Sequence, residues 1–143
     1  MQTITSTMET GFRLARSASK LSTHDQFKVG AAIMKKRRPV SVGANLVKTH
    51  PVFADGDRWY TIHAEMKALL AAEMPIAWCD IFVYRATARD ELAMARPCDE
   101  CLKVLAEAGI RRVYYTTEDG YDMETLEDGK TETGHLQLLS TNG

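Results

Sequence analysis

The sequence predicts an α/β layered domain in which helices back a sheet of about five strands. Apolar residues recur at three- and four-residue steps in three segments, which indicates amphipathic helices. These segments are residues 8–21, 64–73 and 98–108. Short runs rich in Val, Ile, Ala and Tyr indicate strands. They lie at 28–36, 40–47, 80–84 and 110–116, and a last strand is expected at 135–139. Alternating strands and helices are typical of layered α/β domains.

The segments between these elements carry their own signals. Pro39 follows the basic turn 35–38, so the first two strands should pair antiparallel; this turn could touch a phosphate, but a solvated hairpin tip is favoured. The polar, aromatic loop 48–61 leads into His63 and should wall a site. Residues 85–96 read as a polar insertion with a helical turn at 91–94, and 117–134 as an acidic tail.

Length and composition restrict the class of protein. A chain of 143 residues with 45% hydrophobic and 26% charged residues predicts one globular domain, 1–143. Eighteen basic and nineteen acidic residues offer no overall attraction to nucleic acid or to an anionic membrane. Neither a membrane span nor a secretory signal is visible. Three cysteines make no disulfide framework, which favours a reducing cytoplasm, or the host cytoplasm for a viral protein.

Two short motifs, about thirty residues apart, carry the candidate chemistry. His63-Ala64-Glu65 stands where the polar loop meets the second helix, and Pro97-Cys98-Asp99-Glu100-Cys101 begins the third. Imidazole nitrogen and thiolate sulfur suit zinc, so His63, Cys98 and Cys101 are three candidate ligands with a fourth position left for water. Glu65 could handle that water's protons. This pattern, H-x-E followed by P-C-x-x-C, is the signature of zinc nucleobase deaminases.

Other interpretations of these residues are less favoured. Cys98 and Cys101 could be a redox pair or half of a structural zinc knot. A knot lacks further paired cysteines, because Cys79 stands alone in an apolar strand, and a redox pair leaves His-Ala-Glu unexplained. His50 precedes the site and is a candidate substrate contact. Trp59 and Tyr60 could stack on a base or pack against the helix start, with neither favoured.

At these residues the chain resembles the cytidine and deoxycytidylate deaminase superfamily, dCMP deaminases in particular. The motif of residues 61–66 with Pro97-Cys98-x-x-Cys101 carries the resemblance, and Val29-Gly30-Ala31-Ala32, Val42-Gly43-Ala44-Asn45 and residues 101–113 agree with it. The likeness covers roughly residues 8–116. It implies a three-layer α/β/α fold with a mixed sheet and helices on both faces, a Zn²⁺ cofactor and a homo-oligomer.

The resemblance also implies roles for residues around the metal. Asn45 would contact the sugar and the backbone of Ala64 would hold the base. The histidine at 63 favours the dCMP-like or tRNA-adenosine-like branches, because tetrameric deaminases of free cytidine commonly place a cysteine there. The insertion 85–96 replaces the short link that usually precedes Pro-Cys.

The leading functional hypothesis is zinc-dependent hydrolysis of a cytosine nucleotide, dCMP to dUMP and ammonia, with Glu65 as proton shuttle. Its partner would be a small-molecule nucleotide. One alternative is a deaminase acting on a base in single-stranded nucleic acid or tRNA, which the neutral charge does not favour. Another is a zinc-stabilised binding module without catalysis, against which the presence of Glu65 counts. The sequence does not rank the candidate phosphate contacts. They are Arg13, Lys48, Arg58 and Arg85.

Overall fold

A seven-stranded mixed sheet organises the computed structural model, which describes residues 2–3, 6–23, 27–49, 59–127 and 130–137. The strands of the main sheet are β1 (Gln2–Thr3), β2 (Lys28–Lys35), β3 (Arg38–Ala44), β6 (Asp80–Ala86), β7 (Arg112–Thr117), β8 (Gly120–Glu127) and β9 (Lys130–Gln137). Their spatial order is β1-β9-β8-β7-β6-β2-β3. The pairs β6–β7 and β1–β9 are parallel and the other pairs antiparallel. A separate pair contains β4 (Leu46–Thr49) and β5 (Trp59–Ile62).

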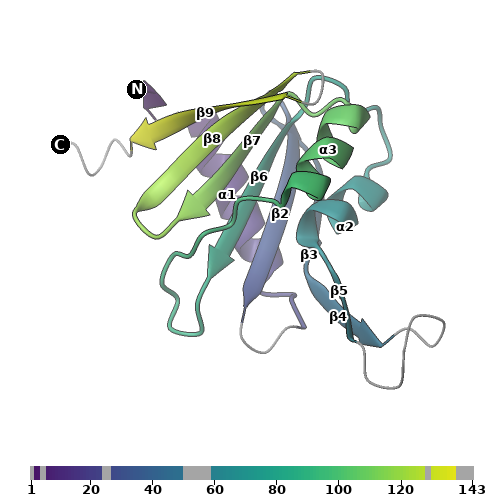
Figure 1. Cartoon of the computed structure of the whole chain (residues 1–143), viewed down its shortest axis with the longest axis vertical. Coiled ribbons are helices and arrows are strands. Elements are labelled where there is room, and N and C mark those ends of the chain that lie inside the picture. Colours follow the sequence, from purple (N-terminus) through teal and green to yellow (C-terminus); the bar gives the residue numbers. More distant parts are fainter. Residues whose placement is uncertain (1, 4–5, 24–26, 50–58, 128–129, 138–143) are drawn as a thin grey trace.

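In the described part of the chain, three helices cover the two faces of this sheet. Helix α1 (Ser6–Ser19) lies on one face, and α2 (Ala64–Ala71) and α3 (Asp99–Ala108) lie on the other (Figure 1). The expected three-layer α/β/α fold is therefore confirmed, with a wider sheet than the five strands that the sequence predicts.

The central strands are apolar on both faces because both faces are covered by helices. Along β2, Ala31 and Ile33 join the core beneath α2 and α3, whereas Ala32 and Met34 join the core beneath α1. Strand β6 alternates in the same way, since side chains of successive strand residues point to opposite faces. This explains why these strands read as continuous apolar runs.

Close contact between α2 and β3 depends on Gly43. A Cβ atom added there would lie 2.5 Å from the backbone nitrogen of Ala68 and 2.7 Å from the carbonyl oxygen of Ala64. The hydroxyl of Ser41, also on β3, donates a 2.6 Å hydrogen bond to the Ala68 carbonyl. The beginning of α2, which carries the His-Ala-Glu motif, is therefore held directly against the sheet.

The insertion before Pro-Cys is not helical, so the expected turn at 91–94 is wrong. Leu92 instead forms an antiparallel bridge with Ala86. The buried hydroxyl of Thr116 on β7 donates a 2.8 Å hydrogen bond to the Ala93 carbonyl, and its backbone carbonyl accepts one from the Ala95 amide. These long-range hydrogen bonds keep the segment extended along the sheet.

Other differences from the sequence prediction lie at element ends and in the tail. The apolar periodicity of segments 8–21 and 64–73 includes Leu21 and Leu70, which are nevertheless 72% and 80% exposed. The predicted second strand is divided into β3 and β4 at Asn45. The acidic tail forms β8 and most of β9, and the last strand starts earlier than expected. In the described part of the chain, no helix combines the length and apolarity that a membrane crossing requires.

Candidate metal centre and active site

The three candidate metal ligands lie at the N-termini of two neighbouring helices. His63 is the N-cap of α2 and Cys98 is the N-cap of α3, both with extended backbone, and Cys101 lies in the first turns of α3. The Cys98 sulfur accepts a 3.4 Å hydrogen bond from the Cys101 amide. The sequence expectation that both motifs begin helices is confirmed. Exposed amide groups and the positive end of the helix dipole at such positions stabilise thiolates.

Their donor atoms converge on one point. One nitrogen of His63 and the sulfurs of Cys98 and Cys101 all lie within 4.8 Å of one another. The Nδ1 atom of His63 is 3.1 Å from Cys101 Sγ. Zinc bond lengths separate the donors of a tetrahedral site by about 3.5–3.8 Å, so these residues could hold a zinc ion after small shifts. Three protein donors are also the number that leaves a position open for a reactant.

The thiol of Cys101 is protonated at neutral pH in the metal-free fold. Burial raises the pKa of Cys101 to about 12, helped by the hydrogen bond with Cys98 and by the neighbouring Glu65 carboxylate. Because a coordinating thiol must lose its proton, metal binding at this centre is coupled to proton release.

Glu65 points into the same site from the first turn of α2. Its side chain is 4% exposed, and burial raises its pKa, opposed by its own backbone amide and by His63 and Cys101. Two residues of a regular helix at this spacing would not share a face. His63 precedes the helix and has an extended backbone, φ −70° and ψ 145°, whereas Glu65 lies within the helix. The rule for two residues of a regular helix therefore does not apply to this pair.

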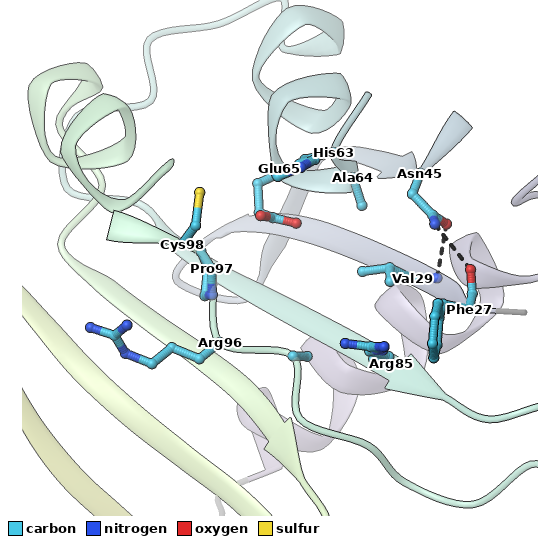
Figure 2. A pocket seen from close by; sticks show the side chains of 11 residues that line it. Phe27, Val29, Asn45, His63, Ala64, Glu65, Arg85, Arg96, Pro97 and Cys98 are labelled. Atoms are coloured by element: carbon cyan, nitrogen blue, oxygen red, sulfur yellow. Dashed lines mark hydrogen bonds between the residues drawn. The ribbon is translucent and has the colours of Figure 1, made fainter. Parts of the chain in front are cut away.

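These residues open on a pocket of about 290 Å³. Figure 2 shows Glu65 and Cys98 towards one end, and Phe27, Arg85 and Asn45 towards the other. The pocket is lined by Phe27, Val29, Asn45, His63, Ala64, Glu65, Arg85, Ala95, Arg96, Pro97 and Cys98. Its volume is close to the lower limit for small-ligand sites.

Asn45, expected to contact a sugar, lies in this pocket but is already bonded to the protein. Its Oδ1 accepts a 2.9 Å hydrogen bond from the Val29 amide, and its Nδ2 donates one of 3.0 Å to the Phe27 carbonyl (Figure 2). Each Asn amide nitrogen carries two hydrogens, so one donor remains for a ligand. Ala64 lines the pocket, and its contact with the base stays a prediction. His50 lies outside the described residues.

The sequence analysis missed one residue of the pocket, Phe27, and named another, Arg85, without ranking it. Phe27, 39% exposed, presents an aromatic ring directly before β2; an aromatic residue two positions before Val29-Gly30 was the available signal. Arg85, one of the four candidate phosphate contacts, lines the pocket, whereas Arg58 and the side chain of Lys48 lie outside what the structure describes. Arg13 lies on α1, across the sheet (Figure 1).

A layered α/β sheet that presents one histidine, two cysteines and a buried glutamate at adjoining helix N-termini defines a metal-dependent enzyme with an open coordination position. The model of the cytidine and deoxycytidylate deaminase zinc-binding region matches residues 3–117. The chain therefore belongs to the cytidine and deoxycytidylate deaminase family and is a zinc-type deaminase.

Similar proteins agree with this assignment. An uncharacterized deaminase in the luxG 3′ region of Aliivibrio fischeri is 34% identical over 110 residues, 72% of this chain and 67% of that protein. The dCMP deaminase of cyanophage S-TIM5, in complex with dCMP and dUMP, is similar with 26% identity and a TM-score of 0.57 over 75% of this chain and 78% of its own. The fold is also that of Burkholderia pseudomallei cytidine deaminase, with 21% identity and a TM-score of 0.57 over 92% and 93% of the two chains.

Proposed function

We propose that this protein hydrolyses dCMP to dUMP and ammonia. The observation that carries the proposal is the convergence of His63, Cys98 and Cys101 beside the buried Glu65 at one end of a pocket of about 290 Å³. The choice of dCMP is supported by the likeness to a phage deaminase whose structure contains dCMP and dUMP.

In this proposal His63, Cys98 and Cys101 hold the metal and Glu65 moves the protons. A zinc ion held there supplies Lewis-acid activation of water. Glu65 accepts a proton from the water that adds to the amine-bearing ring carbon, and gives it to the adjacent ring nitrogen. The second proton of the water goes to the amino group, the C–N bond breaks and ammonia leaves. The raised pKa of Glu65 suits this role, because a carboxylate with a pKa nearer neutrality takes the proton of water more readily and can still act as an acid in the next step.

The remainder of the pocket would hold the nucleotide. The backbone of Ala64 would contact the base, the free N–H of Asn45 would contact the sugar, and the ring of Phe27 offers an apolar surface for either. His50 stays a predicted substrate contact.

A polynucleotide substrate is less well supported. The exposed basic residues 35–38 begin at the last residue of β2, Lys35, whereas the pocket residue Val29 lies near the start of that strand. Six residues of strand separate these positions by about 20 Å. A strand of nucleic acid would therefore have to span that distance to use both.

Two further properties belong to the proposal. Exposed apolar side chains lie in the last turn of α2 and in the segment that follows it. They are Leu70, Met74 and Trp78, which are 80%, 47% and 75% exposed. A homo-oligomer would cover them. A cytoplasmic location would keep the three cysteines as free thiols, as they are in the described structure.

Ammonia release from a substrate panel tests the proposal. The panel contains deoxycytidine, cytidine, dCMP, dCTP, adenosine and a cytosine-containing single-stranded oligonucleotide, with Glu65→Ala as the inactive control. We expect the highest kcat/KM with dCMP and no release by the control. Turnover confined to the oligonucleotide would replace the proposal with the nucleic-acid alternative, and a zinc-loaded protein silent on the whole panel would contradict it.

A further inference from the structure

The pocket has a cationic end as well as a metal end. Arg85, on β6, lines it and places its guanidinium carbon 4.0 Å from the centre of the Phe27 ring. Its Nη1 donates a 3.2 Å hydrogen bond to the Met94 carbonyl. These two contacts hold the guanidinium beside Phe27, away from Cys98 (Figure 2).

Arg85 differs from the other arginine of the pocket in having no anionic partner. Arg96 is paired with Glu124 at 2.7 Å and with Asp99 at 3.4 Å. Within the described residues Arg85 forms no ion pair, and its Nε is buried without a hydrogen-bond acceptor. A guanidinium has five N–H donors, of which the protein engages one here. Of the two described arginines that line the pocket, Arg85 is therefore the one without a carboxylate partner.

We propose that Arg85 selects a nucleotide over a nucleoside by binding the phosphate on the substrate's sugar. The inference rests on the proposed function, which places the base beside Glu65 and so directs the sugar and phosphate towards Asn45, Phe27 and Arg85. Two oxygens of a phosphate can accept parallel hydrogen bonds from the free donors of a guanidinium, and the phosphate carries the opposite charge. The hydroxyl of a nucleoside is uncharged and offers a single oxygen. Arg85 thus supplies binding energy that only the phosphorylated substrate receives.

A purely structural role makes a different prediction. If Arg85 only supports Phe27 and the 93–95 segment, its loss should impair nucleoside and nucleotide equally. If it binds phosphate, the loss should fall on the nucleotide, and mainly on KM, because the contact is remote from the reacting carbon and is the same in ground state and transition state.

The experiment compares kcat/KM for dCMP and deoxycytidine in the wild type, Arg85→Gln, Arg85→Lys and the control Arg89→Gln. Arg89 is exposed in the same insertion and does not line the pocket, so its variant makes the same charge change elsewhere. We expect Arg85→Gln to lower kcat/KM for dCMP on the order of 10- to 100-fold. The loss with deoxycytidine should be several-fold smaller. Arg85→Lys keeps a point charge but loses the forked geometry, so its kcat/KM for dCMP should lie between those of Arg85→Gln and the wild type. Arg89→Gln should match the wild type.

Equal losses on both substrates, or no loss on either, would overturn the assignment. A binding measurement separates this failure from failure of the proposed reaction. Calorimetric titration with dUMP and deoxyuridine should show tighter binding of dUMP to the wild type, and Arg85→Gln should abolish that preference. The same result in a protein that turns over neither substrate would keep Arg85 as the phosphate contact and discard the proposed reaction. A wild type without preference for dUMP would remove the phosphate role.

Discussion

Glu124 on β8 accepts a 2.7 Å hydrogen bond from Nε of Arg96, the residue that precedes Pro97-Cys98. The Glu124 side chain is 3% exposed and that of Arg96 is 35% exposed. Strand β8 lies beyond the part of the sequence that resembles the family, yet through this pair it contacts the segment that leads into α3. The start of α3 is therefore held by β8, through the Arg96–Glu124 pair, as well as by its contact with His63 at the start of α2.

Glu124→Gln should destabilise the fold and loosen the metal centre. The change removes the charge of a buried carboxylate that accepts a charged hydrogen bond, which costs about 1–3 kcal/mol. Urea denaturation measures the change in the free energy of unfolding, and a chelator competition measures the zinc affinity. Glu118→Gln, at an exposed position, is the matched control. Equal stability and zinc affinity in the two variants would show that the Arg96–Glu124 pair does not support the site.

Cys98→Ala should abolish zinc binding, whereas Cys79→Ala should retain it. Cys79 is fully buried and is not among the residues whose donor atoms converge, so its loss affects packing alone. Bound zinc stabilises the folded state, so chelation should lower the melting temperature of the wild type and of Cys79→Ala but not that of Cys98→Ala. Metal analysis and thermal unfolding with and without chelator give both readouts. Stoichiometric zinc in Cys98→Ala would remove Cys98 from the ligand set.

Zinc affinity should rise with pH between 6 and 8. The pKa of Cys101 is raised to about 12 in the metal-free fold, so its thiol is protonated over this range and zinc must displace the proton. Each rise in pH lowers the free-energy cost of that displacement. Chelator competition at several pH values, corrected for the protonation of the chelator, measures the slope. A slope of zero would mean that the ligands are already deprotonated before the metal binds.

Glu65→Gln should keep zinc and fold but lower kcat by about 10²–10⁴-fold, because the amide cannot carry a proton between water and the ring. Glu73→Gln, an exposed change just beyond α2, should leave kcat unchanged. Single-turnover kinetics with zinc-loaded protein separate chemistry from product release. Retention of the wild-type rate by Glu65→Gln would assign the proton transfers to another group.

The metal centre could be predicted from the sequence because each of its two halves is set by a short motif at one helix start. His63 and Cys98 are each the last residue before a helix, and the spacing of Cys98 and Cys101 brings both sulfurs to the same helix end. Such positions follow from short motifs and from the apolar periodicity that places the helices. The extended backbone of His63 then directs Glu65 to the same point.

Residues placed by long-range contacts could not be predicted in this way. That Arg85 lines the pocket depends on which end of β6 meets it. The extended conformation of the 91–94 segment comes from hydrogen bonds to Thr116 and from the bridge of Ala86 with Leu92. The outer strands β8 and β9 contain many charged and polar residues, so their sequences lack the apolar alternation that marks a strand.

Gly43→Ala should reduce activity more than its effect on stability explains. Its Cβ atom would contact the backbone of α2 at Ala64 and Ala68, so the helix that carries Glu65 must move away from β3. Overpacking of this kind costs about 1–3 kcal/mol. The displacement also changes the position of Glu65 relative to Cys98 and Cys101, and kcat should fall even at temperatures where the variant is fully folded.

Gly11→Ala provides the matched control on the opposite face of the sheet. Its Cβ atom would meet the ring of Phe82, which belongs to the core beneath α1. This core lies on the face of the sheet opposite the metal centre. Both variants should therefore lose stability in denaturant titrations, but only Gly43→Ala should lose kcat and zinc affinity when assayed well below its melting temperature. Equal loss of kcat in the two would mean that activity depends on overall stability and not on the seating of α2 against β3.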